Sequence, residues 1–362
     1  MRSPFVLQAV LLVTAGSTLA ALVVWLTKRR AISFRFTIAW SLVALLAILA
    51  IPIIPVVEPL AGAFSLSASA FLTVVVALIF VLVTIQLSIS VSHLGYRLDD
   101  LAIAQALQAS RDGPRSERES DTLVVVPAWN EQCTIGEVVL QIRTHGFTVI
   151  VVDDGSTDRT AEFAAREGAH VLRLPTNLGV GAALRTGLRY AVERGYRRVV
   201  QCDGDGQHPP VEIRALLAAQ EATGAHMLIG SRFLRPGPSE STPTAPRLLA
   251  MSLLARSASS ATGVELTDAT SGFRVIGAPL LGEVARVLPN HYLGDTYEMV
   301  VAAGRAGYRI VEFPVPKLDR RFGSSSATAL AATKFTLRVV AVVALRAHAA
   351  LPSPADKAPP GA

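Results

Sequence analysis

Three long apolar runs without a charged residue lie in the N-terminal part of the chain, and they limit what it can fold into. The runs cover residues 5–27, 36–57 and 70–91. Each contains about the 20 residues that an α-helix needs to cross a bilayer, where a helix satisfies its backbone hydrogen bonds internally. The sequence therefore predicts an α-helical transmembrane domain of three spans over residues 1–92, with buried core helices as the alternative.

The basic residues predict how these spans are oriented. The first run continues through Trp25 to Lys28-Arg29-Arg30, which is typical of a retained anchor rather than a cleaved signal peptide. The loop after this run is basic, whereas the loop after the second run carries Glu58 and no Lys or Arg. Because basic loops stay in the cytoplasm, we expect a multi-pass protein of a bacterial-type plasma membrane, with the chain after residue 91 cytoplasmic.

Residues 93–121 read as an amphipathic helical stalk followed by a linker. Leu94, Leu98 and Leu101 recur at spacings of four and three, as on one face of a helix. This stripe indicates either a helix that pairs with a copy of itself or a solvated helix end. A homo-oligomer through the stalk or the membrane helices is thus one expectation. The stretch 109–121 is polar with Gly-Pro inside it, as linkers are.

Composition excludes several classes of function. The formal charge is +6, but no dense stripe of Lys and Arg interleaved with aromatic residues is present, so we expect no nucleic acid as partner. Basic residues beside apolar segments fit a membrane surface or phosphate ligands. Cys133 and Cys202 lack C-x-x-C spacing, so we expect two buried, reduced thiols and no zinc site.

From Thr122 onward, short apolar strands alternate with helical patterns, which is typical of a parallel α/β sheet. We expect strands at 123–127, 149–152, 171–173 and 199–202, and polar residues follow each of them. Because the carboxyl ends of parallel strands share one edge of the sheet, these polar residues should meet in a single crevice. They are Trp129-Asn130-Glu131, Asp153-Asp154, Asn177 to Gly181, and Asp203-Gly204-Asp205.

The last of these clusters predicts a metal site. Asp203 and Asp205 are two residues apart after a strand, so their side chains can point to the same face. Two carboxylates on one side suit Mg²⁺ or Mn²⁺, which keep positions open for substrate phosphates. The alternative is an ordinary Asp-Gly turn.

Four motifs occur in order and at suitable spacing: V-V-V-P-A-W-N-E, V-V-D-D-G-S-T-D-R-T, N-L-G-V-G-A-A-L-R-T-G and D-G-D-G-Q-H-P-P. Over residues 122–334 the chain resembles the family 2 glycosyltransferases, in particular the branch of polyprenyl- or dolichol-phosphate mannosyl- and glucosyltransferases. The resemblance implies a GT-A fold, with a Rossmann-like, mostly parallel sheet, over residues 122–326. The three apolar runs resemble a small bacterial membrane domain, DUF2304, that is sometimes fused to such enzymes.

The resemblance also implies roles for particular residues. A UDP- or GDP-hexose would be bound by the strand-end residues, and a divalent cation by the D-x-D-x-Q residues. Asp153-Asp154 as a helix-capping turn, and Arg232 and Arg274 in buried salt bridges, are the alternatives. The implied nucleotide-sugar residues are Pro127, Trp129, Glu131, Asp153, Asp154, Asn177, Gly181 and Asp203; the metal ligands are Asp203, Asp205 and Gln207; the catalytic residues are Asp205, Arg232, Arg274, Arg320 and Arg321.

The implied reaction is the inverting transfer of one hexose to a polyprenyl phosphate, whose ionised oxygen needs no general base. The chain lacks the Q-x-x-R-W motif of processive synthases, which favours one sugar per turnover. If the acceptor were a sugar hydroxyl of a cell-envelope polysaccharide, Asp268, Asp295 or Glu298 would be candidate bases. A non-catalytic membrane scaffold that binds nucleotide sugar is a further alternative.

The end of the chain is apolar and basic, then rich in Pro and Ala. Residues 327–351 interleave apolar residues with Lys334, Arg338 and Arg346, which predicts an amphipathic helix at the membrane interface or one packed on the catalytic domain. Residues 352–362 read as a disordered tail.

Overall fold

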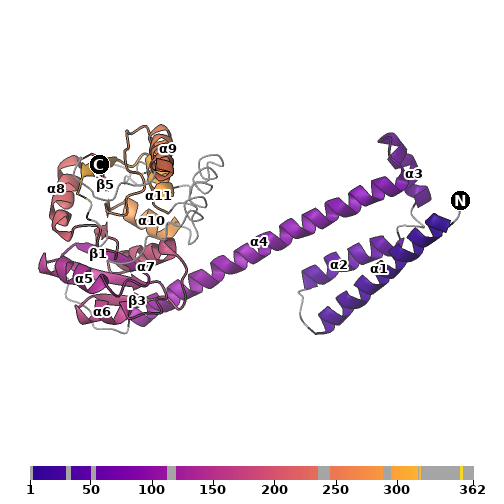
Figure 1. The fold of residues 1–362 in the computed structure, drawn as a ribbon, viewed down its shortest axis with the longest axis horizontal. Coiled ribbons are helices and arrows are strands. Elements are labelled where there is room, and N and C mark those ends of the chain that lie inside the picture. Colours follow the sequence, from indigo (N-terminus) through magenta and orange to yellow (C-terminus); the bar gives the residue numbers. More distant parts are fainter. Residues whose placement is uncertain are drawn as a thin grey trace, which may run out of the picture. The chain divides into compact units, whose positions relative to one another are not determined.

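The computed structural model describes residues 3–29, 34–49, 54–111, 120–234, 245–287, 295–316, 318 and 351–353 (Figure 1). It divides into two compact units, Met1–Gly95 and Tyr96–Ala362. The predicted basic loop residues Arg320 and Arg321 lie outside the described residues, as does the predicted helix at 327–351 except for Leu351.

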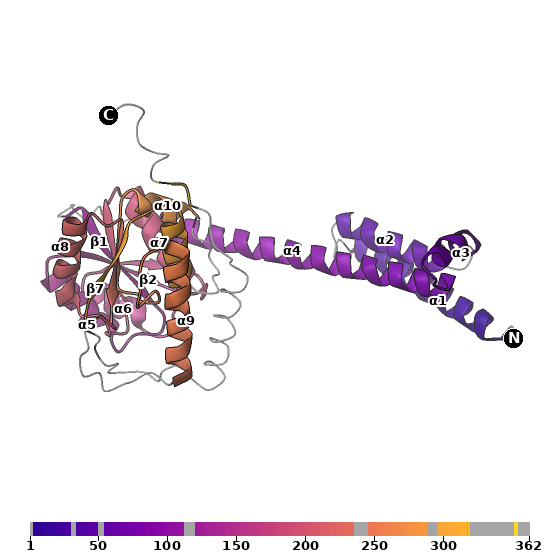
Figure 2. The ribbon, with the colours of Figure 1, turned by 90° about the horizontal axis from the view of Figure 1, so that it is seen from above.

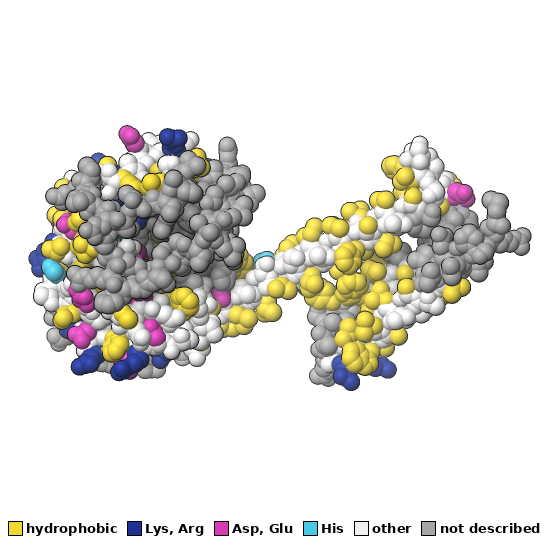
Figure 3. All heavy atoms as spheres, viewed as in Figure 1, with side chains coloured by type: hydrophobic (Ala, Val, Ile, Leu, Met, Phe, Trp, Pro, Cys, Tyr) yellow, Lys and Arg dark blue, Asp and Glu magenta, His cyan; other side chains and the backbone are white. Residues whose placement is uncertain are grey.

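The first unit is helical and apolar. It contains α1 (Ser3–Lys28), α2 (Phe34–Leu49), α3 (Ile54–Ala63) and the first part of α4 (Ala68–Arg111). Helices α1 and α2 approach closely at Gly16, where an added Cβ would lie 2.8 Å from the Ile48 side chain. Apolar side chains cover much of the described surface of this unit (Figure 3). A surface of this kind is typical of helices in contact with lipid rather than with water.

One helix in the described part of the chain is long and apolar enough to cross a membrane, at Thr73–Ser110 within α4. Val13–Lys28 and Phe36–Leu49 form shorter apolar helices. Within the predicted second span, 36–57, the structure describes α2 to Leu49 and α3 from Ile54. Three membrane spans remain a prediction.

Helix α4 covers both the third apolar run and the segment predicted as a stalk. In the second unit, one face of its last turns is buried in the core of the α/β domain, at Ile103 and Leu107. The predicted stripe lies on the other side, with Leu94, Leu98 and Leu101 exposed by 58%, 57% and 67%. The segment thus has two apolar faces. Sequence spacing predicted the exposed face with the three leucines, and not the buried face with Ile103 and Leu107.

Polar contacts reinforce the docking of this helix end. Arg185 Nη1 donates to Asp100 Oδ1 at 2.7 Å, and Arg194 Nη2 donates to the Ser110 carbonyl at 3.0 Å. The Ser110 hydroxyl lies 2.7 Å from His170 Nε2, and the imidazole stacks on Tyr190. A cation at the carboxyl end of a helix also complements the helix dipole.

This docking predicts a pH dependence. Burial and the charge of Arg194 lower the pKa of His170, so the folded state favours the neutral imidazole. As the pH falls below about 6.5, His170 therefore takes up a proton in the unfolded chain before it does so in the folded chain. The contribution of neutral His170 to folding stability is lost progressively as the pH falls further through its lowered pKa in the folded state. In detergent, the melting temperature of the wild type should fall more steeply between about pH 7 and pH 5 than that of His170→Gln. Parallel curves would contradict a contribution from His170.

A seven-stranded mixed sheet forms the centre of the second unit, in the order β3-β2-β1-β4-β6-β5-β7. The four predicted strands are confirmed as β1 to β4, and their neighbouring pairs are parallel. Strand β6 runs antiparallel to both β4 and β5. The strands are β1 (Thr122–Ala128), β2 (Thr148–Asp153), β3 (His170–Arg173), β4 (Arg198–Gln201), β5 (Met227–Ser231), β6 (Arg274–Gly277) and β7 (Ile310–Pro314).

Helices cover both faces of this sheet and enclose two apolar cores (Figure 2). Strand residues alternate between the cores, so Val199 packs in one and Val200 in the other. One face carries α5 (Ile135–Thr144), α6 (Thr160–Arg166) and α8 (Ile213–Thr223); the other carries α7 (Val180–Glu193), α9 (Ala245–Thr262), α10 (Leu280–Val287) and α11 (Asp295–Arg305). The predicted α/β architecture with a mostly parallel sheet is confirmed.

Candidate active site

The loops that follow β1 and β2 are joined by hydrogen bonds. Asn130, which has a positive φ of 55°, donates its N–H to Ser156 Oγ at 3.0 Å, and its side-chain oxygen accepts from Thr157 N at 2.9 Å. The Glu131 N–H donates to Thr160 Oγ1 at 2.8 Å. Trp129 is left half exposed beside these contacts. The predicted nucleotide-binding loops therefore form one connected edge.

Residues on this edge differ in how accessible they are. Pro127 is buried within β1, whereas Glu131 is half-buried. Cys133 is exposed in the same loop, so the expectation of two buried thiols was wrong for it. Cys202 is buried, and burial with the charges of Asp203 and Asp205 raises its pKa well above the ordinary value.

Asp153 and Asp154 hold the neighbouring loops. Asp153 is fully buried; its carboxylate accepts from Ser156 N at 3.0 Å and from Arg173 Nε at 3.1 Å. Asp154 accepts from the N–H groups of Leu178 and Gly179, both at 2.8 Å. Burial raises the pKa of Asp154, and these two hydrogen bonds oppose the rise. Both carboxylates shape the crevice, and a contact with the nucleotide stays a prediction.

Helix α7 begins at the same edge. Gly179 precedes it with φ of 97°, which favours glycine. Gly155 also requires glycine, because an added Cβ would lie 2.4 Å from the backbone carbon of Thr176. Asn177 is exposed at this helix start, and Gly181 is buried in its first turn.

The acidic motif follows β4 and is fixed through its backbone. Thr134 Oγ1 donates to the Gly204 carbonyl at 2.8 Å, and Asp205 Oδ1 accepts from Gln207 N at 3.0 Å. The Gln207 carbonyl accepts from Leu318 N at 3.1 Å, and Leu318 lies two residues before Arg320 in the sequence. Asp203, Asp205 and Gln207 are each partly exposed. The segment after β7 thus returns to the acidic motif.

His208 holds the backbone of Asp203 through a hydrogen bond. Its Nδ1 accepts the Asp203 N–H at 3.1 Å, and its ring stacks on Phe273 with centroids 5.0 Å apart. Because Nδ1 is the acceptor, the neutral ring carries its proton on Nε2. The 3.6 Å approach of Nδ1 to Asp203 Oδ2 is then a close contact rather than an ion pair. The structure therefore gives His208 a supporting contact to the Asp203 backbone.

Gly272 leaves room for the Asp203 carboxylate. A Cβ at position 272 would lie 2.6 Å and 2.7 Å from its two oxygens. In the described residues, no group of three or more His, Cys, Asp and Glu side chains is placed to hold a metal ion. Asp203 and Asp205, with the amide of Gln207, nevertheless form a partly exposed set of hard oxygen donors. Such a set fits a cation that also binds phosphate oxygens.

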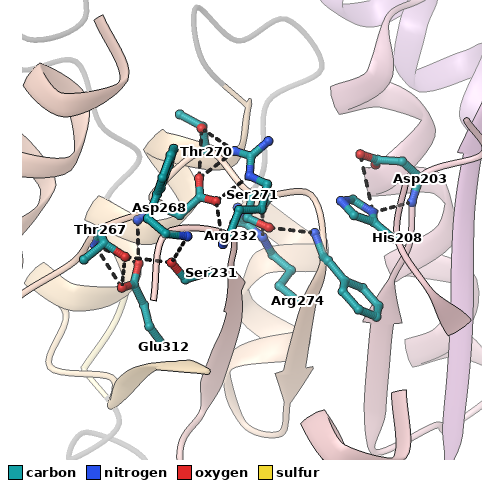
Figure 4. Close-up of polar contacts among 12 residues, drawn as sticks. Asp203, His208, Ser231, Arg232, Thr267, Asp268, Thr270, Ser271, Arg274 and Glu312 are labelled. Atoms are coloured by element: carbon teal, nitrogen blue, oxygen red, sulfur yellow. Dashed lines mark hydrogen bonds and ion pairs between the residues drawn. The ribbon is translucent and has the colours of Figure 1, made fainter. Parts of the chain in front are cut away.

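Arg232 and Asp268 form an ion pair at the carboxyl end of β5 (Figure 4). Arg232 Nε and Nη2 donate to the two oxygens of Asp268 at 2.6 Å and 2.7 Å. The Asp268 side chain is fully buried, whereas that of Arg232 is 19% exposed. Burial alone would lower the pKa of Arg232, but the hydrogen bonds to Asp268 and the charges of Asp268 and Asp203 raise it overall.

Arg274 is fully buried at the start of β6. Its Nε donates to the Ser271 carbonyl at 3.0 Å, and its Nη2 donates to the same oxygen. Burial lowers the pKa of Arg274 to about 10, while the charges of Asp268 and Asp203 oppose the shift. The guanidinium therefore shapes the turn around Ser271 between the two carboxylates.

Glu312 on β7 binds the turn that carries Asp268. Its carboxylate accepts from Thr267 N at 2.9 Å, from Asp268 N at 2.7 Å and from Thr267 Oγ1 at 2.7 Å. Sequence analysis did not single out Glu312, Thr134 or Gly272. Gly272 stands in the segment T-D-A-T-S-G-F-R and Glu312 in A-G-Y-R-I-V-E-F-P-V, both of which resemble segments of the glycosyltransferase family, but spacing alone gives neither residue a role.

Comparison with known proteins gives consistent matches. Residues 123–281 match the family model described as glycosyl transferase family 2. An undecaprenyl-phosphate mannosyltransferase from Micrococcus luteus is 34% identical over 215 residues, covering 56% of this chain and 86% of that protein. A polyprenol monophosphomannose synthase from Mycolicibacterium smegmatis is 30% identical over 233 residues, covering 60% and 85%. Glucosyl-3-phosphoglycerate synthase from Mycobacterium tuberculosis has a TM-score of 0.46 at 21% identity, covering 66% and 83%.

Proposed function

Because the chain belongs to glycosyl transferase family 2 and is a glycosyltransferase, we propose that it moves one hexose from a nucleotide sugar to a polyprenyl phosphate, with inversion at the anomeric carbon. One observation carries the proposal. The acidic motif follows β4 and the Arg232–Asp268 pair follows β5 at the same edge of the sheet, and Gly272, from the turn after Asp268, lies against the Asp203 carboxylate. This arrangement supports a donor site and an acceptor site next to each other.

The state of Asp268 favours a phosphate acceptor over a sugar hydroxyl. A hydroxyl needs a general base, but both oxygens of Asp268 are bound by Arg232 and the carboxylate is fully buried. Glu298 is buried as well, and the side chain of Asp295 is not among the described ones. A phosphate oxygen is already ionised, and the partly exposed guanidinium of Arg232 suits it. The names of the two relatives, which specify lipid phosphates, support the same choice.

The remaining roles follow the sequence predictions. We propose that Pro127, Trp129, Glu131 and Asn177, with the loops held by Asp153 and Asp154, bind the nucleotide at the edge where α7 begins and Gly181 lies in its first turn. Arg274 stabilises the acceptor-side turn and adds positive charge beneath it. Arg320 and Arg321 would contact the donor diphosphate; both lie outside the described residues.

Asp203, Asp205 and Gln207 would hold Mg²⁺ or Mn²⁺, and the bound cation would neutralise charge on the departing diphosphate. His208 orients the backbone of Asp203, and Thr134 fixes the Gly204 carbonyl between the two carboxylates. The protein thus sets the directions of both carboxylates before substrate arrives.

The apolar first unit supports a membrane location. A polyprenyl acceptor lies in the bilayer, and a three-span anchor with a cytoplasmic α/β domain would hold the enzyme beside it. Such an arrangement gives the catalytic domain access to nucleotide sugars in the cytoplasm.

Transfer assays test the proposal directly. Membranes with the full chain would be given labelled UDP-glucose or GDP-mannose with polyprenyl phosphate. The wild type should form a labelled lipid that mild acid cleaves. A label found only in water-soluble products would refute the lipid acceptor and favour a polysaccharide hydroxyl. Donor binding without any transfer would favour the non-catalytic scaffold.

We also propose that the chain self-associates through Leu94, Leu98 and Leu101, which are exposed on α4. Their spacing matches the a and d positions of a coiled coil. In a Cys133→Ser background, Leu98→Cys should give a disulfide-linked dimer in oxidised membranes. Ser92→Cys, exposed on the opposite side of the same helix, is the control. Equal cross-linking of both variants would contradict pairing through this stripe.

A further inference from the structure

We propose that Glu312 is a positioning residue for the acceptor. Glu312 holds Arg232 in place in two ways, through its counterion Asp268 and through the end of the strand that carries it. The inference rests on the proposed function, because it assigns Arg232 to the acceptor phosphate. Glu312 is on β7, where it pairs in register with Ile229 of β5, two residues before Ser231. It thus lies beside the strand that carries Arg232 and binds a turn that comes from a different part of the chain.

The first connection runs through the counterion of Arg232. Glu312 Oε1 accepts the Asp268 N–H at 2.7 Å, and both oxygens accept the Thr267 N–H at 2.9 Å. These bonds fix the backbone from which the Asp268 carboxylate reaches the guanidinium. A carboxylate that accepts several hydrogen bonds makes stronger contacts than a neutral acceptor would.

The second connection runs through the strand end itself. Thr267 Oγ1 donates to Glu312 Oε2 at 2.7 Å and lies 2.7 Å from Ser231 Oγ. Because the Thr267 hydroxyl donates its hydrogen to Glu312, the Ser231 hydroxyl is the donor in the contact between Ser231 and Thr267. Ser231 directly precedes Arg232, and Figure 4 shows Glu312, Thr267 and Ser231 together beneath the ion pair. One carboxylate therefore anchors both the arginine and its partner.

This arrangement predicts a specific kinetic effect. Without Glu312, the Asp268 turn and the end of β5 lose their common anchor, and the guanidinium no longer has one fixed direction. The acceptor phosphate should be bound less well, whereas the nucleotide loops after β1 and β2 do not contact Glu312. In Glu312→Ala the KM for polyprenyl phosphate should rise about tenfold, with the KM for the nucleotide sugar within about twofold of the wild type.

Two further variants separate positioning from folding. Glu312→Gln keeps an acceptor for the two N–H groups and can donate to Thr267 Oγ1, so it should restore most of the acceptor KM. Thr267→Val keeps the side-chain volume and removes only the hydroxyl relay to Ser231. Thr267→Val should raise the KM for polyprenyl phosphate about threefold to tenfold. If Glu312→Ala does not fold, Thr267→Val is the variant that tests the inference. Glu221→Ala, an exposed carboxylate paired with Arg198, is the matched control.

A double-mutant cycle with Arg232→Ala makes the test decisive. If Glu312 acts through Arg232, adding Glu312→Ala to Arg232→Ala should change the acceptor KM by less than about twofold. Independent, multiplying effects would overturn the inference, as would equal rises in both KM values, while the proposed function would stand. A wild-type enzyme that transfers no sugar to polyprenyl phosphate would instead refute the proposed function and the inference with it.

Discussion

Asp205→Asn should lower kcat on the order of a thousandfold, because the neutral amide cannot balance the charge of a divalent cation beside the leaving diphosphate. The substitution keeps the local turn, since an amide oxygen can still accept the Gln207 N–H that Asp205 Oδ1 accepts at 3.0 Å. The measurement is the rate of labelled glycolipid formation at saturating substrates with Mg²⁺ or Mn²⁺. Calorimetric titration with a nucleoside diphosphate should also lose its dependence on the divalent cation.

The control for this prediction is Glu193→Gln, an exposed carboxylate at the carboxyl end of α7. It should keep wild-type rates and cation dependence. Diphosphate binding by Asp205→Asn that still needs a divalent cation, at wild-type affinity, would remove Asp205 from the set of metal ligands. A wild-type enzyme that works equally well after chelation would remove the cation altogether.

Gly272→Ala should weaken cation binding by roughly 10- to 100-fold without unfolding the domain. The new methyl group would lie 2.6 Å and 2.7 Å from the oxygens of Asp203, a distance that no Cβ tolerates. The carboxylate is the free end of a partly exposed side chain, so it can swing away at small cost to the fold. Manganese binding, followed by electron paramagnetic resonance, should weaken while the melting temperature stays within a few degrees.

Gly282→Ala is the matched control, because an added Cβ there meets no atom within 4 Å in α10. This change should leave manganese binding unaltered and raise stability by roughly 0.5–1 kcal/mol through helix propensity. If Gly272→Ala bound manganese as the wild type does, Asp203 would not be a ligand. A large fall in melting temperature would show that the turn itself, rather than the carboxylate, had moved.

The sequence predicted the first half of the α/β domain well because its signals are local. Apolar strands of four to seven residues ended in polar clusters, and parallel strands must bring such ends to one edge. Asp203, Asp205 and the loops at Asn130 and Asp154 therefore lie where the motifs place them.

The acceptor side could not be derived in the same way. Arg232 and Asp268 are 36 residues apart, and Thr267 and Glu312 are 45 apart. No spacing rule links such residues, because their contact depends on how β5, β6 and β7 are ordered in the sheet. The docking of the predicted stalk could not be derived either, because two apolar faces on one helix give one periodic signal, and only packing shows that Ile103 and Leu107 are buried.

The antiparallel direction of β6 has a consequence for how this enzyme can diversify. Since β6 lies between β4 and β5, the segment that leads into it reaches the edge where the acidic motif ends. The region that we propose contacts the acceptor thus includes a central strand of the sheet rather than an appended module. Exchange of the C-terminal half between relatives would replace a central strand, so new acceptor preferences should arise by point substitutions rather than by recombination of modules.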